Sequence, residues 1–489
     1  MPSRQDQLHS YQYSQQRVVA ALVTHDPDPH RSPLRRAGSA ALISLVVASL
    51  AVGGAAVYGL LKGRSSVEPR NEAVVFLEKG SGARFVYLKS DDRMHPVLNY
   101  SSALLIANAT EPKMVDASSQ SLAKVPLGDP LGIPDAPDSL PAAKGGMVKR
   151  VWTVCSRTPA DSGSGTPAQS LLVVGDRLTD GTVLPVPRAD TPAADLRGLL
   201  VVDPSGRTYL VYNNKRFLIP AGRLQRTQSF LGWTQQPLPV AAAWINAVPI
   251  GPDLKPPGIR DLGDPSPAID DFEIGQLLRI RGDASGTDKW GVVLGDGVAD
   301  ITDVQARLLQ VDPEAYDRQD MDLNLYSSLP HSQTQLIGEA AAAGLPPAVP
   351  VLLNGPEQVC LTYDGEDAKG DAGQGVLSIR IGPTAPNGSP VAGAPAVAGG
   401  VQADLVHVPR GKGALVVAAA SPTAPAGSGT VSIVTDTGRR YPVANRDVLP
   451  RLGYAGVEPA PIPGQLVSLL PQGPALDPVR ARQGDSTEG

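Results

Sequence analysis

The sequence predicts a single transmembrane α-helix followed by an α+β extracytoplasmic domain, in which four small strand-turn-strand-helix repeats surround a central mixed β-sheet with pseudo-two-fold halves. Three observations lead to this fold class: one long uncharged apolar segment, segments that recur at fixed spacing after it, and two cysteines in corresponding strand-like segments. Among 489 residues, glycine (51) and proline (48) are frequent. Because both residues punctuate regular elements, we expect short strands and helices joined by many loops.

The apolar segment runs from Ala37 to Leu61 and contains no charged residue. As a helix it would span about 37 Å, enough to cross about 30 Å of hydrocarbon. A cleaved signal peptide would be shorter, and a buried core helix would have a polar face. Lysine and arginine are equally frequent on both sides, so the positive-inside rule leaves its orientation open. If the helix packs on partner helices, the expected close-contact face is Gly53, Gly54, Ala55 and Ala56.

Residues 1–36 are expected to contain an amphipathic helix that begins after the possible N-cap Ser3 and stops at Asp26-Pro27-Asp28-Pro29. A short apolar stripe with few basic residues favours docking on a partner protein over binding to a membrane surface. The alternative is a frayed leader. The stripe comprises Leu8, Tyr11, Val18, Val19, Leu22 and Val23.

Segments after the apolar helix recur at matched spacing, as expected of internal repeats. Arg84–Leu88 and Arg207–Val211 are 123 residues apart, and so are Val125–Gly128 and Val248–Gly251. Each unit is expected to contain a strand, a tight turn, a second strand, one or two short helices and a Pro-Gly exit. Chance resemblance among short strands is the alternative.

Two further copies are expected in the second half of the chain. One starts at Thr430–Val434 and ends at Leu470–Leu476, whereas a weaker one starts at Trp290–Leu294 and is expected to end near Leu345-Pro346-Pro347. Asp296-Gly297 and Thr437-Gly438 suit tight turns because glycine adopts positive φ at little cost. The expected closing helices are Trp244–Val248 and Gln465–Leu470.

Strand-like segments between the repeats are expected to form the central sheet. They are Met147–Cys155, Ser170–Gly175, Val351–Leu353, Gln358–Tyr363, Gly375–Ile381 and Ala414–Ala418. Stretches rich in Gly, Pro, Ser, Ala or charge at 157–168, 383–400 and 481–489 are expected to be loops or disordered.

The expected domains are a cytoplasmic segment 1–36, the transmembrane helix 37–61, repeat 1 at 73–141, central core 145–200, repeat 2 at 201–258, repeat 3 at 275–347, central core 348–428, repeat 4 at 429–480 and a disordered tail 481–489.

Cys155 and Cys360 are the only two cysteines, and both follow the apolar segment. Two thiols make a poor zinc site, whereas in an oxidising compartment they favour one disulfide. Two buried free thiols are the alternative. The bridge would join the two halves and close a loop of about 200 residues, worth about 5 kcal/mol in the chain-entropy model. The pair also favours an extracytoplasmic C-terminal domain.

No catalytic, cofactor-binding or metal-binding residue is predicted. Gly411-Lys412-Gly413 and Gly80-Ser81-Gly82 lack the spacing of a phosphate-binding loop. His95, His331 and His407 stand alone, Asp270-Asp271 and Asp91-Asp92 suit solvated turns, and Arg281-Gly282-Asp283 resembles an adhesion tripeptide that arises readily by chance. The formal net charge of −5 argues against nucleic acid as a partner.

Several motifs together resemble EccB, a core membrane component of the actinobacterial type VII (ESX) secretion system. Cys155 and Cys360 lie in segments similar to its two cysteine segments, 152–156 and 359–363. The other motifs are Arg4–Tyr11, Pro33-Leu34-Arg35-Arg36, Leu131–Pro141 and Trp244–Leu254.

This resemblance implies a cytoplasmic N-terminus, one crossing of the cell membrane, a periplasmic domain of four repeats, and assembly with EccC, EccD and EccE into an oligomeric complex. The expected function is that of a non-catalytic structural subunit, in contact with membrane lipid and forming a homo-oligomer. Some members of the family are labelled ATPases, so an ATP-hydrolysing subunit is one alternative, although the sequence has no nucleotide motif and no cofactor is predicted. A cell-wall binding module is another.

Overall fold

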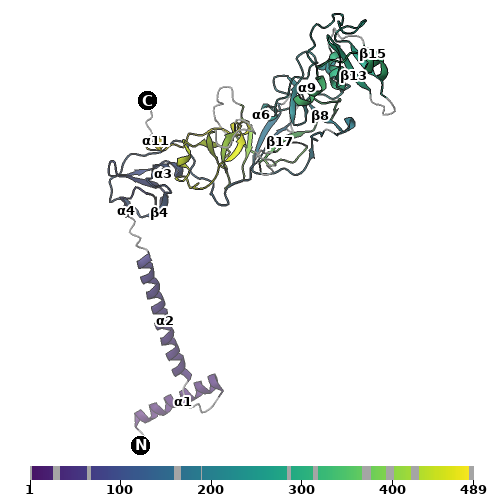
Figure 1. Ribbon diagram of the computed structural model, residues 1–489. Coiled ribbons are helices and arrows are strands. Elements are labelled where there is room, and N and C mark those ends of the chain that lie inside the picture. The colour runs from purple at the N-terminus through teal and green to yellow at the C-terminus, as the bar shows by residue number, and fades with distance from the viewer. Residues whose placement is uncertain are drawn as a thin grey trace. The chain divides into compact units, whose positions relative to one another are not determined.

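The computed structural model describes residues 3–25, 33–62, 68–158, 167–188, 190–282, 288–311, 318–365, 376–391, 401–419 and 429–483. The chain divides into two compact units, Met1–Pro69 and Arg70–Gly489 (Figure 1). Within them, the chain has one N-terminal apolar helix and an α+β domain with several small mixed sheets.

In the first unit, the described residues form the helices α1 (Arg4–Thr24) and α2 (Pro33–Lys62). Ser3 caps α1 through a capping box with Asp6, which satisfies amide groups that the first helical turn leaves free. Within α2, Gly38–Tyr58 has a mean hydropathy of 2.3 and none of it is buried, so it is long and apolar enough to cross a membrane. The expected stop at 26–29 lies outside the described residues, and α1 ends just before it.

Four small sheets in the second unit share one strand order: two antiparallel hairpin strands, a central strand and a parallel edge strand. The repeat 1 sheet is β3 (Arg93–Pro96), β2 (Arg84–Leu88), β1 (Val74–Glu78) and β4 (Lys113–Ala117). Repeat 2 has β10 (Lys215–Leu218), β9 (Thr208–Tyr212), β8 (Arg197–Val202) and β11 (Leu238–Pro239). Repeat 3 has β14 (Gly297–Ile301), β13 (Lys289–Leu294), β12 (Leu277–Ile280) and β15 (Arg318–Met321). Repeat 4 has β23 (Arg440–Pro442), β22 (Val431–Val434), β21 (Ala414–Ala419) and β24 (Ala460–Pro463).

The fifth sheet has seven strands in the order β19-β20-β6-β5-β17-β18-β7. Its central strands are β5 (Val151–Arg157) and β17 (Gln358–Asp364), which pair antiparallel. The others are β6 (Gln169–Val174), β7 (Thr182–Val183), β18 (Val376–Ile381), β19 (Ser389–Pro390) and β20 (Leu405–His407).

Short helices cover these sheets. They are α3 (Tyr100–Ile106), α4 (Ser119–Leu122), α5 (Leu224–Leu231), α6 (Ala242–Ala247), α7 (Asp303–Gln310), α8 (Leu323–Ser328), α9 (Leu336–Ala343), α10 (Gly464–Ser468) and α11 (Pro478–Ala481), with 3-10 turns at Ala193–Asp195 and Arg446–Val448. The helices α6 and α10 correspond to the two expected closing helices.

Two segments expected in the central sheet belong to repeat sheets instead. Val351–Leu352 (β16) pairs with β8 of repeat 2, and Ala414–Ala419 is the central strand of repeat 4. Both segments are short and apolar, and such a pattern indicates a buried strand without identifying its partner. The expected loop at 383–400 also contains strand β19, whose Pro390 lies at the sheet edge, where proline is tolerated. The rest of that loop, residues 392–400, lies outside the described residues.

Each repeat ends with a proline-containing exit segment that forms a one-residue parallel bridge to the outer hairpin strand. In repeat 4, Arg440 N–H donates to Pro471 O over 3.0 Å, and Gly473 N–H donates to Arg440 O over 2.8 Å. The four bridges are Met94 with Leu127, Arg216 with Ile250, Val298 with His331, and Arg440 with Gln472.

The sequence indicated that repeat 3 ends near Leu345-Pro346-Pro347. This prediction is wrong, because the exit segment of repeat 3 is Leu329–Ser332. Val298 N–H donates to Pro330 O over 2.7 Å, and Ser332 N–H donates to Val298 O over 2.8 Å. The exit segment of repeat 3 has Ser332 at the position where the exit segments of the other repeats have glycine.

A ring lies directly over the exit glycine in the other repeats. A Cβ added to Gly251 would lie 2.6 Å from the Phe217 ring, and one added to Gly473 would lie 2.3 Å from Tyr441. Gly128 stands under His95 in the same way. In repeat 3 the ring position holds Ala299, which leaves room for the Ser332 side chain.

The repeats pack in pairs. Repeats 1 and 4 share one apolar core, in which α3 contacts α11, whereas repeats 2 and 3 meet through α5 and α7. Figure 1 shows α11, at the C-terminal end, beside α3 near the start of the same unit. The central sheet shares its largest core with repeats 2 and 4 through α6 and α10.

Candidate functional site

The structure brings Cys155 and Cys360 directly opposite each other on β5 and β17, where they form a disulfide. Their Cα atoms are 4.0 Å apart, near the spacing of a narrow, non-hydrogen-bonded antiparallel pair. Both residues are fully buried. The site therefore links the two chain halves at the middle of the seven-stranded sheet.

The face of the sheet around the disulfide has a small core. Leu171, Val173 and Leu178 pack against the two cysteines. Two residues from the cysteines along each strand, on the same face, the buried hydroxyls of Thr153 and Thr362 share a hydrogen bond of 2.9 Å. Sequence patterns did not indicate this threonine pair, because each hydroxyl obtains its partner only from strand pairing.

The opposite face of the sheet is covered by helices. Trp152, Val154 and Leu361 belong to the large core that includes Trp244 of α6. The Ser156 hydroxyl accepts a hydrogen bond from Ala241 N–H over 2.9 Å, which fixes the start of α6 against β5. One face of the central sheet thus packs against α6 of repeat 2, and the other face carries the disulfide.

Polar contacts fasten the loop after β6 to neighbouring strands of the sheet. Asp364 at the end of β17 pairs with Arg177, and Asp176 lies 3.3 Å from His407 Nε2 on β20. These contacts join the loop after β6 to strands from the second half of the chain.

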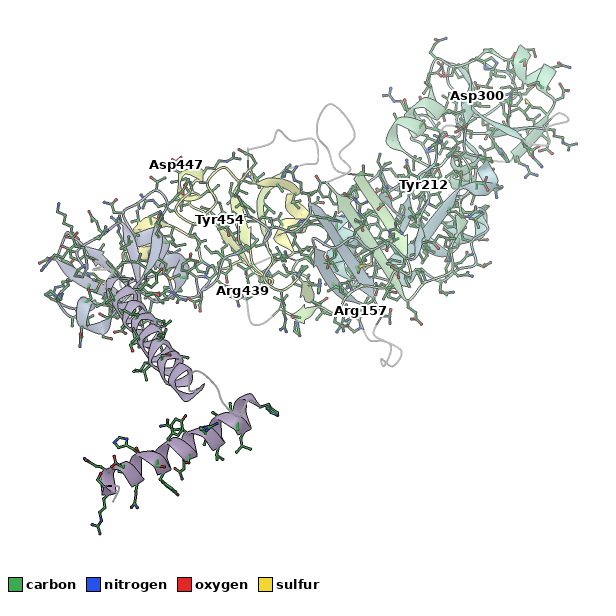
Figure 2. The ribbon with its side chains drawn as sticks, turned by 90° about the horizontal axis from the view of Figure 1, so that it is seen from below. Arg157, Tyr212, Asp300, Arg439, Asp447 and Tyr454 are labelled. Carbon is green, nitrogen blue, oxygen red and sulfur yellow. A yellow bond between two sulfur atoms is a disulfide. The ribbon has the colours of Figure 1, made fainter. Side chains whose placement is uncertain are left out.

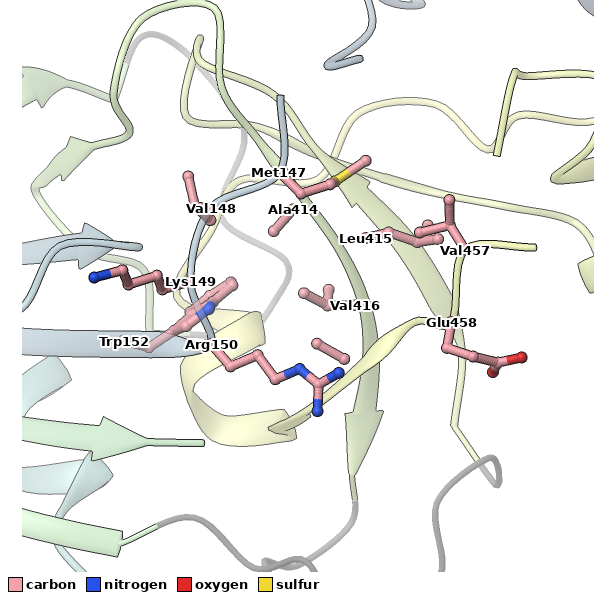
Figure 3. Close-up of a pocket in the computed structure, with 11 residues that line it drawn as sticks. Met147, Val148, Lys149, Arg150, Trp152, Ala414, Leu415, Val416, Val457 and Glu458 are labelled. Atoms are coloured by element: carbon pink, nitrogen blue, oxygen red, sulfur yellow. The ribbon is translucent and has the colours of Figure 1, made fainter. Parts of the chain in front are cut away.

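A cavity of about 150 Å³ lies where the central sheet meets repeat 4. Figure 3 shows Val148 and Lys149 of the connecting segment on one side of it and Val457 and Glu458 on the other. Its remaining lining includes Trp152, Val416 and Arg150, so the walls combine apolar side chains with charged ones. The connecting segment itself is tied to repeat 4, because Val148 N–H donates to Gly413 O over 2.9 Å.

The three histidines after the apolar helix lie apart. His95 belongs to repeat 1, where its ring nitrogens face Asp129 O and Asp91 Oδ2; His331 packs edge-on against Tyr326 in repeat 3; and His407 lies in the central sheet. Within the described ranges, no three His, Cys, Asp or Glu side chains cluster in a way that could hold a metal ion.

The other sequence motifs lie in turns or surface strands. Asp92 and Asp271 have positive φ, as turn residues do, and Gly411 N–H donates to Asp436 Oδ2 over 2.8 Å. Arg281 forms a 2.9 Å ion pair with Asp320, and Asp283 of the triplet lies outside the described residues.

The carboxylate of Asp203, in the turn between β8 and β9, is a strongly bonded buried charge. Burial opposes its ionisation, but hydrogen bonds from Ser205 and Arg207 outweigh this and lower the pKa of Asp203. In repeat 3, burial together with a 2.6 Å hydrogen bond to Asp300 raises the pKa of Tyr326. Both groups stabilise individual repeats.

Comparison with known proteins identifies the family. The family profile described as "Type VII secretion system ESX-1, transport TM domain B", the EccB profile, matches residues 1–487. The chain belongs to the EccB family. It is therefore a type VII secretion component, as the motifs in its sequence indicated.

Curated relatives match over almost the whole chain. The chain is 27% identical to the ESX-3 secretion system ATPase EccB3 of Mycolicibacterium smegmatis, covering 96% of this chain and 88% of the relative. It is also 27% identical to the ESX-1 secretion system ATPase EccB1 of Mycobacterium tuberculosis, covering 96% of this chain and 92% of the relative.

Solved structures share the fold. An EccB3 dimer from an ESX-3 core complex matches with a TM-score of 0.62 and 26% identity, covering 84% of this chain and all of that chain. A chain of an intact ESX-5 inner membrane complex matches with a TM-score of 0.66 and 22% identity, covering all of this chain and 96% of that chain.

Proposed function

We propose that this chain is a non-catalytic structural subunit of the type VII (ESX) inner membrane complex and supports protein export across the cell membrane. The observation that carries the proposal is the end-to-end family match, which includes α1, α2 and all five sheets. The similar chain of the ESX-5 complex comes from an intact inner membrane assembly, and a second similar chain comes from its periplasmic assembly.

The proposed topology places the N-terminus in the cytoplasm, α2 across the membrane, and the second unit in the periplasm. The apolar stretch Gly38–Tyr58 supports one crossing. The disulfide supports an oxidising compartment for the second unit. Within α2, residues Gly53, Gly54, Ala55 and Ala56 are the proposed contact with partner helices.

The proposed architecture of the second unit has pseudo-two-fold halves about the central sheet. The pairing of repeat 1 with 4 and of repeat 2 with 3, together with the antiparallel β5–β17 pair, supports this arrangement. The proposed domain boundaries are those given by the sequence, except that repeat 2 begins with β8 at Arg197 and repeat 4 includes β21 at Ala414–Ala419. In this arrangement the disulfide staples two corresponding strands.

The proposed partners are EccC, EccD and EccE, together with further copies of this chain. The solved EccB3 dimer supports a homo-oligomer. The apolar stripe of α1 is exposed along its length, with 74% of Leu22 accessible, and it is the proposed docking surface for the cytoplasmic partners.

Two matched substitutions test the docking role of α1. Leu22→Asp places a charge within the stripe, whereas Ser10→Asp places one on the opposite side of the same helix. We expect Leu22→Asp, like deletion of residues 1–30, to abolish co-purification of the other membrane components from the producing cell, and Ser10→Asp to leave it unchanged. A complex that survives Leu22→Asp and the deletion would exclude this role.

A second candidate is an ATP-hydrolysing subunit, because the names of the curated relatives include the word ATPase. Calorimetry of the full-length chain with ATP and Mg²⁺ tests it. Nucleotide binding, with hydrolysis that a point substitution removes, would favour this function over the structural one. A flat titration would reject it.

A further inference from the structure

A second cavity, of about 360 Å³, lies at the seam between repeats 2 and 3. This volume is within the range of pockets that hold small ligands, and such pockets often lie at the seams of a fold. Its lining includes Arg188, Leu196 and Tyr212 on one side and Thr302, Ile337 and Ala341 on the other.

Much of the wall is apolar. Leu196 and Tyr212 are buried residues of the repeat 2 core, and Ile337 and Ala341 face the cavity from the exposed side of α9 in repeat 3. A branched aliphatic group placed between these residues would be removed from water on both sides.

Tyr212, which is labelled in Figure 2, provides a polar group at this wall. Its side chain is only 2% exposed, and among the residues that the structure describes its hydroxyl has no hydrogen-bond partner. The hydroxyl oxygen is not among the fully buried unpaired side-chain atoms of the described residues, so it remains accessible to water and to a ligand. Burial raises the pKa of Tyr212, so the hydroxyl stays protonated and can donate a hydrogen bond to an acceptor in the cavity.

The rim adds further donors and a positive charge. The Arg188 side chain is exposed and makes no ion pair with any described residue. Lys215 lies near Gly344 and donates to Ala343 O at the end of α9. The one carboxylate beside the lining residue Thr302, that of Asp303, is paired with Arg307 at 3.0 Å. Arg188 and Lys215 therefore offer cationic donors to an anionic acceptor, although the exposed carboxylates of Asp190 and Asp195 adjoin the lining residues Thr191 and Leu196.

We propose that this cavity binds a carboxylate attached to a branched apolar group, either a free short-chain acid or the carboxy-terminal end of a peptide chain. The Tyr212 hydroxyl and the Arg188 guanidinium donate to the carboxylate, and the apolar group packs between Leu196 and Ile337. Because the lining comes from both repeats, the ligand braces repeat 3 against repeat 2.

Three small probes distinguish the ligand chemistry and its source. N-acetyl-leucine mimics a chain end, isovalerate is a free acid with the same branching, and N-acetyl-leucinamide lacks the carboxylate. Binding to the full-length chain in detergent is measured by calorimetry and ligand-observed NMR. We expect at least one acid to bind and the amide to bind about tenfold more weakly, because hydrogen bonds to a charged acceptor are lost.

Matched variants locate the binding. Ala341→Phe fills the cavity from an exposed position, whereas Ala342→Phe, at the next exposed position of the same helix, does not line it. We expect Ala341→Phe to remove binding, Ala342→Phe to retain it, and Arg188→Ala and Tyr212→Phe each to weaken it several-fold.

Three outcomes would overturn the proposal: neither acid binds, Ala341→Phe binds as well as the unaltered chain does, or the amide binds as tightly as the acids. The melting temperature of each variant, measured without ligand, separates lost binding from lost folding. The proposal is independent of the secretion role, because neither docking of α1 nor hydrolysis of ATP enters the measurement.

Discussion

Cys155 and Cys360 are 205 residues apart in sequence, yet they face each other across the central strand pair of one sheet. Each belongs to a different half of the second unit, and each half carries two of the four repeats. A covalent bond at this position limits how far the halves can separate in the unfolded chain. The disulfide is therefore expected to contribute to the stability of the whole unit.

Removing the disulfide by Cys155→Ser together with Cys360→Ser should lower the free energy of unfolding by about 3–5 kcal/mol. Denaturation monitored by circular dichroism, with and without a thiol reductant, measures this. The reductant should destabilise the unaltered chain and leave the double variant unaffected. An unaltered chain that melts at the same temperature in both conditions would exclude a stabilising disulfide.

Introducing a side chain at an exit glycine should destabilise its repeat. Gly251→Ser forces the new Cβ against the Phe217 ring, at a cost of about 1–3 kcal/mol. Repeat 3 shows the alternative packing, with Ala299 and Ser332 at these positions. In a Phe217→Ala background, Gly251→Ser should therefore cost much less, and a double-mutant cycle measures the coupling. Additive costs would contradict direct contact as the cause.

Tyr454→Phe should loosen the contact between repeat 4 and the segment that follows repeat 1. The buried Tyr454 hydroxyl donates to Pro141 O over 2.9 Å, and its loss leaves that carbonyl unsatisfied at about 1–2 kcal/mol. Hydrogen exchange should increase in α3 and α11 together. Val479→Ala, at an exposed position of α11, serves as the control and should change little.

Asp203→Asn should destabilise repeat 2 at neutral pH by about 2 kcal/mol, because the charged hydrogen bonds to Ser205 and Arg207 are lost. The pKa of Asp203 is lowered from its ordinary value of 3.8. Its contribution to stability is therefore complete above that value and is lost as the pH falls through the lowered folded value.

The free energies of unfolding of the unaltered chain and of the Asp203→Asn variant should therefore converge as the solution is acidified below about pH 4. Urea unfolding at a series of pH values measures the difference. Asp253→Asn, at an exposed position of the same repeat, provides the comparison and should show no such convergence. A difference that stays constant down to low pH would show that the charge of Asp203 is not its cause.

Local patterns predicted the hairpin of each repeat, because alternating apolar residues and turn residues act within a few positions of each other. Asn213 and Asn214 both have positive φ in the turn between β9 and β10, and Gly297 and Gly438 do so at the expected turns. The central strands of repeats 1 to 3 and the parallel edge strands, such as β1 and β4, were not predicted, and the central strand of repeat 4 was assigned to another sheet. Parallel partners are separated by a helix, so no local pattern identifies them.

Two predictions from the sequence are wrong because the features concerned depend on residues far apart in the chain. Ala414–Ala418 is as apolar as a central-sheet strand, and only its pairing with β22 and β24 assigns it to repeat 4. The exit of repeat 3 escaped detection because Ser332 replaces glycine, a change that the distant Ala299 permits. A substitution compensated across the fold alters the local motif without altering the structure.

The sequence by itself determined the apolar helix, the repeating hairpins, the family and the two cysteines suited to a bridge, since each of these rests on composition or on residues close together in the chain. Only the tertiary structure decided which repeats share a core, which strand belongs to which sheet, and that Tyr212 lines a cavity between repeats 2 and 3. These features depend on contacts between residues far apart in the chain, and their energies arise from packing and desolvation that exist only once the chain has folded.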